Sequence, residues 1–295
     1  MASVEMSAEL PPARTFLSPL LLCSLGLTAA IAVWGVVDNQ GLAQVAREAI
    51  QTQFSGRAWF IMLTVSGLLL VSIGLACSRF GDVVLGQDGD QPEFSTISWL
   101  SMLFAAGMGV GLLYWGTAEP LTHYLIIKPS EAPVEPAPGA LFITNFHWGF
   151  HAWAIYAMTG LVIAYFTFRR GAPSLVSAPL LQVYGVNAVT RSCGWLFDLL
   201  AIVAISIGLG GSIAMGIFQI EDGLQALFGV QDVGRWLTFT IFAVLCVCYV
   251  PPLMVDLGRG MSMLSNAALG IAILLLVFIL LAGPTAYLMG GVVQG

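Results

Sequence analysis

The sequence predicts an all-α, polytopic membrane protein with about seven transmembrane helices. Of its 295 residues, 58% are hydrophobic and 9% are charged, and the mean hydropathy is +0.90. These are too few polar residues to cover the surface of a soluble domain. The apolar runs are about 17–25 residues long, which suits a helical crossing and is too long for a strand of a β-barrel.

Seven apolar stretches, each bounded by charged or Pro/Gly-rich residues, are the expected spans. They cover residues 16–37, 58–78, 95–125, 140–167, 194–219, 234–250 and 263–290. If the N-terminus lies in the cytoplasm, most of the arginines face the cytoplasm, while Arg47, Arg57, Lys128 and Arg235 face the outside of the cell. This arrangement gives a modest positive-inside bias.

The third span is longer than an upright crossing of about 20 residues, and its glycines lie near its middle. Gly107, Gly109 and Gly111 together cost a helix up to about 3 kcal/mol relative to alanine. Their two-residue spacing distributes them around a helix, so tight packing along one face explains them poorly. We expect two half-helices, whose free carbonyls coordinate a cation and whose bare backbone lets a substrate approach.

The fourth span is unusually aromatic. On a continuous helix, Trp148, Tyr156 and Trp153 fall at roughly 0°, 80° and 140°, which places them on one side. Three such rings can surround a quaternary ammonium group through cation–π attraction of about 0.5–2 kcal/mol per ring. An aromatic belt at the membrane interface is the alternative. Both tryptophans lie well inside the 140–167 stretch, which favours an aromatic box.

Polar residues in these two spans have more than one interpretation. Glu119, followed by Pro120, lies towards the outer end of the third span, where it ends or gates the helix, contacts a ligand or meets water. His147 and His151 have the i,i+4 spacing of paired metal ligands, but they fall on the arc opposite the three rings. Because no acidic or cysteine partner lies on their span, hydrogen-bonded packing between helices is the better interpretation.

Prolines and glycines mark the remaining elements. Residues 128–139 contain four prolines and are expected to form an external loop. Pro251–Pro252 is expected to end the sixth span, and residues 256–266 to form a short helix at the cytoplasmic interface. The glycine-rich stretch 208–216 of the fifth span favours helix packing over a binding site.

Several classes of function find no support in the sequence. The net charge of -6 comes mostly from connecting loops and argues against a nucleic-acid partner. The five cysteines lie in or beside apolar spans without the spacing of a metal clip, so we expect them to pack as small hydrophobic residues. The sequence shows no nucleophile elbow, phosphate loop or zinc motif. We therefore expect neither an enzyme nor an organic cofactor.

At the third and fourth spans the chain resembles the betaine/carnitine/choline transporter (BCCT) family. The resemblance begins at 78–81, runs from 92 to 111, includes Glu119–Pro120, resumes at 147–156 and reaches Gly283–Pro284. It implies a LeuT-like transporter fold, in which substrate binds at the midplane between two inverted five-helix repeats. Residues 1–94 would then form a tail and two peripheral helices, and residues 95–295 the first repeat.

The resemblance also implies a function and a site. The function is secondary active import of a trimethylammonium osmolyte, such as glycine betaine, across the inner (plasma) membrane, with the lipid bilayer as surroundings. The implied substrate-binding residues are Trp148, Trp153, Tyr156, Gly107, Met108, Gly109 and Gly111. The backbone carbonyls of Ala105 and Met108 are implied to help hold a sodium ion.

Gly111 bears on the coupling ion. Proton-coupled choline transporters of the family have an acidic residue at this position, whereas sodium-coupled betaine transporters have glycine. The resemblance therefore favours sodium coupling and a zwitterionic substrate, since a zwitterion supplies its own anion while a bare cation gains from a protein carboxylate.

The family pattern extends beyond the first repeat. We therefore expect the chain to be the incomplete, N-terminal part of a transporter, with the second repeat supplied by the same gene or by another chain. Trimers occur in the family, so a homotrimer is a further expectation. The alternative functions are a choline or carnitine carrier or exchanger of the same family, and a membrane binding or assembly protein that does not transport.

Overall fold

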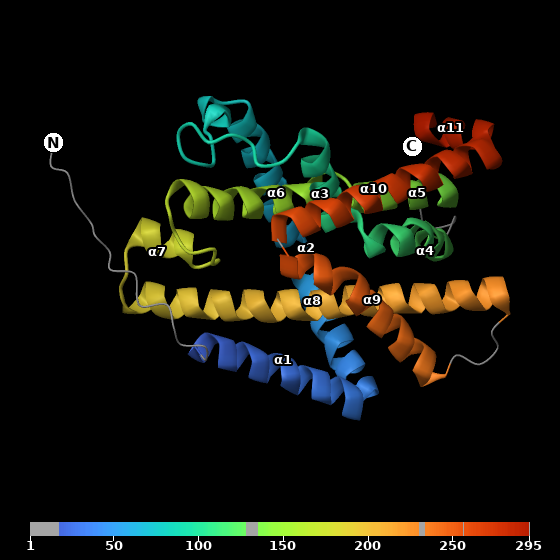
Figure 1. Cartoon of the computed structure of the whole chain (residues 1–295), viewed down its shortest axis with the longest axis horizontal. Coiled ribbons are helices and arrows are strands. Elements are labelled where there is room, and N and C mark those ends of the chain that lie inside the picture. The colour runs from blue at the N-terminus through green and yellow to red at the C-terminus, as the bar shows by residue number, and fades with distance from the viewer. Residues whose placement is uncertain (1–17, 128–134, 230–233, 256, 295) are drawn as a thin grey trace.

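The computed structural model describes residues 18–127, 135–229, 234–255 and 257–294, and over these residues it is helical without a β-strand (Figure 1). The elements are α1 (Pro19–Val37), α2 (Asn39–Ala76), the 3-10 helix η1 (Arg79–Asp82), α3 (Thr96–Met108), α4 (Val110–Ile126), α5 (Pro136–His147), α6 (Phe150–Ala164), the π-helical η2 (Tyr165–Arg169), α7 (Ala178–Tyr184), α8 (Ala188–Phe228), α9 (Arg235–Val255), α10 (Leu257–Ala282) and α11 (Thr285–Gln294).

The described helices account for six of the seven expected crossings. Five helical segments are long and apolar enough to cross a membrane, and the bent pair formed by α3 and α4 makes a sixth. The expected sixth span corresponds to α9, whose apolar part, Arg235–Pro251, is shorter than the others. The all-helical, multi-pass architecture is thus confirmed, and α9 is the one expected span whose apolar part falls short of this length.

Two helices extend well beyond their apolar stretches. Helix α2 begins at Asn39 and not near residue 58, because the Asp38 carboxylate caps it by accepting a hydrogen bond from the Gly41 amide at 2.9 Å. Helix α8 has 41 residues and begins with a capping box made by Asn187 and Thr190. Hydropathy thus locates the membrane-embedded part of such helices, whereas polar N-caps determine the residue at which they begin.

Three expectations about where helices begin and end were wrong. Helix α5 begins at Pro136, within the expected loop, because proline is tolerated in the first turn of a helix; residues 128–134 lie outside the described chain. Helix α9 continues through Pro251–Pro252 to Val255. The expected separate helix over 256–266 is instead the beginning of α10, except for Asp256, which is not described.

Helix α8 runs along most of the length of the molecule, and α2 crosses it in this view (Figure 1). Helix α1 lies alongside α8, while α4 packs against α5 and α10 packs against α3. Helix α2 packs against α6. The buried apolar side chains are mostly small, which lets these helices approach closely. They are Ala140, Ala154, Ala172, Ala178, Val203, Ile217 and Ile241.

A buried carboxylate fixes the segment before α7 to α8. Asp198 is 5% exposed and accepts hydrogen bonds from the Ser177 amide at 2.9 Å and from the Ser177 hydroxyl at 2.7 Å. Gly194, one turn earlier on α8, permits this approach, because a Cβ atom there would lie 2.9 Å from Ser177 Cβ. The connection between the fourth and fifth spans is therefore held by specific polar contacts.

Replacing this carboxylate should destabilise the fold. The Asp198→Ala substitution leaves two buried Ser177 donors without their acceptor, which costs about 1–3 kcal/mol. We expect a lower midpoint of thermal unfolding for the purified protein in detergent. Gly208→Ala on the same helix is the control, since a Cβ there meets no atom within 4 Å. Equal midpoints for the two variants would contradict this account.

Candidate functional site

The third span is broken at its glycines, as the sequence predicted. Helix α3 ends at Met108, Gly109 adopts φ -69° and ψ -120°, and α4 begins at Val110 with a bend of 51°. The last four carbonyl groups of a helix have no partner within it. Those of α3 include the carbonyls of Ala105 and Met108, for which a role in sodium binding stays a prediction.

A second break divides the fourth span, where a continuous helix was expected. Helix α5 ends at His147 and α6 begins at Phe150. Between them, the Trp148 amide donates to the Thr144 carbonyl at 3.1 Å. A Cβ atom at Gly149 would lie 2.9 Å from the Asn145 carbonyl oxygen. The turn between α5 and α6 therefore depends on a residue without a side chain.

A cavity of about 540 Å³ lies between the two broken spans. Its aromatic lining consists of Trp115 of α4 together with Trp148, Trp153 and Tyr156. The structure thus brings the three predicted rings to one cavity and adds a fourth that the sequence analysis had not identified. Polar lining residues are Glu119, Thr122, His123 and His147.

Glycine backbone allows the rings to pack against the third span. A Cβ atom on Gly107 would lie 2.5 Å from Cη2 of Trp153, and one on Gly111 would lie 3.4 Å from Cη2 of Trp148. Trp153 in turn lies 6.0 Å from Tyr156, measured between ring centroids. Gly107 therefore makes room for an aromatic ring, a role that the sequence analysis had not considered.

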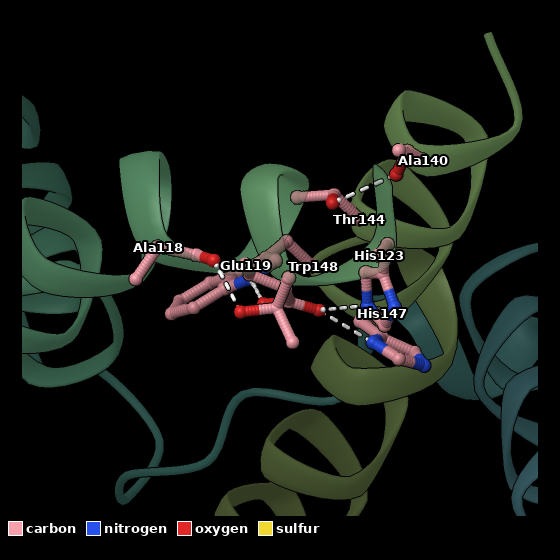
Figure 2. A network of polar contacts seen from close by, with 8 residues as sticks. Ala118, Glu119, His123, Ala140, Thr144, His147 and Trp148 are labelled. Carbon is pink, nitrogen blue, oxygen red and sulfur yellow. Dashed lines mark hydrogen bonds and ion pairs between the residues drawn. The ribbon is translucent and has the colours of Figure 1, made fainter. Parts of the chain in front are cut away.

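The carboxylate of Glu119 lies between the Trp148 ring and two imidazoles (Figure 2). Its Oε2 accepts a hydrogen bond from Trp148 Nε1 at 2.7 Å, and its Oε1 lies 2.5 Å from His147 Nδ1 and 3.4 Å from His123 Nε2. Glu119 therefore positions a ring of the cavity. It does not end the helix, because α4 continues through Pro120 to Ile126.

The histidines divide between two roles. His151 Nε2 lies 3.2 Å from the Ser66 hydroxyl of α2, so hydrogen-bonded packing between helices is confirmed for this residue. The same prediction is confirmed for His147, which contacts Glu119 of α4 and also lines the cavity with Trp148. The expectation that His147 faces away from the rings was wrong, because the backbone turns at Trp148–Gly149. The contribution of His123 was missed, although its i,i+4 spacing from Glu119 is a visible signal.

The other side of the glycine break faces a second cavity of about 820 Å³. It is lined by Ala105, Gly107, Gly109 and Gly111 on one side and by residues of α8 and α9, among them Ser212 and Tyr249, on the other. The backbone of Met108 lies at the same break. Cβ atoms at Gly208, Gly210 and Gly211 would meet no described atom within 4 Å, so the expected packing role of 208–216 stays a prediction.

The chain matches a family model and several characterised relatives. Residues 19–295 match the model described as "BCCT, betaine/carnitine/choline family transporter". The glycine betaine transporter OpuD of Bacillus subtilis is 38% identical over 267 residues, which cover 90% of this chain and 52% of that protein. An ectoine/hydroxyectoine transporter of Virgibacillus pantothenticus is 32% identical, with 95% and 56% covered.

A third relative has a broader substrate description. The betaine/ectoine transporter LcoP of Corynebacterium glutamicum is 31% identical over 274 residues, which cover 90% of this chain and 43% of that protein. The chain thus spans about half the length of the curated relatives that it matches. These relatives are all transporters, in agreement with the expectation that the chain is not an enzyme.

Alanine at Gly107 should disturb the cavity, although alanine usually stabilises a helix. Gly107→Ala forces the Trp153 ring to move, and such overpacking costs about 1–3 kcal/mol. Gly160→Ala in α6 is the matched control, because a Cβ there meets no atom within 4 Å and the substitution should stabilise by about 0.5–1 kcal/mol. We expect thermal unfolding midpoints to shift in opposite directions. A rise in both midpoints would contradict this account.

Proposed function

This chain belongs to the BCCT family of betaine/carnitine/choline transporters, and from this premise we propose that it takes part in sodium-coupled import of a trimethylammonium osmolyte such as glycine betaine. The protein is a multi-pass protein of the cell membrane. Since the chain spans about half the length of its relatives, the activity is proposed for a carrier that contains it. In that carrier, residues 95–295 form the first repeat, and further residues of the same or another chain form the second.

The aromatic cavity is the observation that carries this proposal. A trimethylammonium group has no N–H or O–H with which to donate a hydrogen bond, so its favourable partners are the faces of electron-rich rings. Trp115, Trp148, Trp153 and Tyr156 line one cavity of about 540 Å³. At about 0.5–2 kcal/mol per ring, several rings together supply the affinity of a specific site.

Two neighbouring residues support the rings. Gly107 lets Trp153 approach the third span. Glu119 accepts the indole N–H of Trp148, so the edge of this ring is fixed and its face is left available to a cation. Gly107 and Tyr156 line both the aromatic cavity and the cavity at the glycine break. A zwitterion could therefore place its ammonium among the rings and its carboxylate near the first amides of α4, where the helix dipole favours an anion.

The end of α3 supports sodium as the coupling ion. The carbonyls of Ala105 and Met108 have no partner within α3, and the C-terminal end of a helix carries partial negative charge that attracts a cation. Carbonyl oxygens are suitable ligands for sodium at an interrupted membrane helix. The bend after Met108 thus leaves an arrangement that fits a cation on one helix end and an anionic substrate group on the next.

A second candidate substrate is choline. The Glu119 carboxylate lines the aromatic cavity, and a carboxylate there would favour a bare cation over a zwitterion. We nevertheless favour the zwitterion, because both oxygens of Glu119 already contact Trp148, His123 or His147. The carnitine carrier, the exchanger and the protein that binds without transport remain alternatives for the uptake assay.

Uptake of radiolabelled glycine betaine is expected to depend on sodium. The assay uses cells without carriers of their own, which express either the chain alone or the chain continued by its downstream reading frame. Equal uptake with and without sodium would contradict sodium coupling. Preferential uptake of choline would favour the second candidate, and the absence of uptake by both expressed forms would favour a protein that does not transport.

Removing a ring from the cavity should weaken the apparent affinity for substrate. Trp153→Ala is expected to raise the substrate concentration at half-maximal uptake by about 5- to 30-fold, equivalent to about 1–2 kcal/mol. Trp153→Phe should fall between this variant and the wild type. Trp236→Ala is the control, since Trp236 lies on α9, is 84% exposed and does not line the cavity. Unchanged half-saturation in Trp153→Ala would exclude this ring from the site.

A further inference from the structure

Three potential metal ligands meet at one edge of the aromatic cavity. Glu119 and His123 lie one turn apart on α4, and His147 is the last residue of α5. One ligand atom from each residue lies within 4.8 Å of the other two. Figure 2 shows both imidazoles directed at the same side of the Glu119 carboxylate. Two helices that are adjacent in the chain therefore contribute to one compact cluster.

The cluster is accessible to solvent. The side chains of Glu119 and His123 are 13% and 21% exposed, whereas the His147 side chain is 51% exposed. All three line the cavity of about 540 Å³. If the N-terminus lies in the cytoplasm, this edge of the cavity faces the outside of the cell. An ion can thus reach the cluster from the outer solution through the cavity and its exposed histidine.

We propose that Glu119, His123 and His147 bind a divalent transition-metal ion of the zinc class. Two imidazoles and one carboxylate are ligands that zinc uses in three-residue sites, with a water molecule in the fourth position. At metal–ligand bonds of about 2.0–2.2 Å, tetrahedral ligand atoms are about 3.3–3.6 Å apart. The Glu119–His123 separation of 3.4 Å already has this value, and the 2.5 Å contact with His147 has to open by roughly 1 Å.

Such an ion would act on the substrate cavity through Trp148. The Oε1 atom of Glu119 faces the histidines, while its Oε2 accepts the N–H of Trp148. A metal bound at Oε1 therefore immobilises the carboxylate that holds the ring. It also joins α4 to α5, so any movement of one helix relative to the other is restrained. Zinc outside the cell should then slow transport, a consequence that rests on the proposed function.

The first test measures metal binding directly. The purified full chain is titrated with Co²⁺, whose visible absorption bands report tetrahedral coordination. We expect one equivalent to bind and Zn²⁺ to displace it. His123→Ala and His147→Ala should each weaken binding by at least about tenfold. His151→Ala is the matched control, because it removes the third histidine of the chain, which contacts Ser66 and lies outside the cluster.

The Co²⁺ titrations either support or overturn the proposed metal site. Loss of Co²⁺ affinity in either cluster variant, with His151→Ala unchanged, supports the site, and two variants are used so that misfolding of one does not decide the result. The absence of tetrahedral Co²⁺ bands, or equal affinity in all three variants, overturns it. Retained thermal unfolding midpoints identify the variants that are folded.

The second test separates the metal site from the transport function. Zn²⁺ is expected to reduce sodium-dependent glycine betaine uptake at least severalfold in the wild type and in His151→Ala. The ratio of uptake with and without Zn²⁺ should return towards one in His123→Ala. Co²⁺ binding without uptake in any form would contradict the proposed function and leave the site standing. Uptake by a protein that fails to bind Co²⁺ would overturn the site alone.

Discussion

A helix inside a membrane can interrupt its backbone only where the released amide and carbonyl groups line a cavity or find another protein partner. Two neighbouring spans of this chain are interrupted, one at Gly109 and one at Trp148–Gly149. The aromatic cavity lies between them, and the packing of α4 against α5 brings its walls together. The locations of the rings, the carboxylate and the free carbonyls all follow from where these backbones break.

The sequence alone predicted the fold class and the interruption of the third span at its glycines. Composition and run length establish membrane-spanning helices, and three glycines near the centre of one span are incompatible with a stable continuous helix. Helix ends were predicted less well, because they lie where the hydropathy signal has already faded. The Asp38 cap of α2 and the capping box of α8 determine those ends through local hydrogen bonds. Proline was also overinterpreted, since α9 continues through Pro251–Pro252.

The sequence predicted several residues of the candidate site but not the contacts that join them. Aromatic spacing identified Trp148, Trp153 and Tyr156, yet the continuous helix assumed for them is broken by the turn at Gly149. The approach of Trp153 to Gly107 depends on the distance between two spans, which no single periodicity encodes. The same reason explains the cluster around Glu119, because His147 joins it from the next helix. Tertiary contacts thus determined which of several reasonable interpretations was correct.

Tyr156 forms part of the wall of three cavities. Its ring lines the aromatic cavity, the cavity at the glycine break and a third cavity of about 730 Å³ that reaches Phe168 near the end of the fourth span. The residue is 63% exposed. Rotamer changes of exposed side chains take picoseconds to nanoseconds, so a rotation of this one ring would change the shape of all three cavities without movement of a helix. A ligand that contacts this ring in one cavity therefore also contacts part of the wall of the other two.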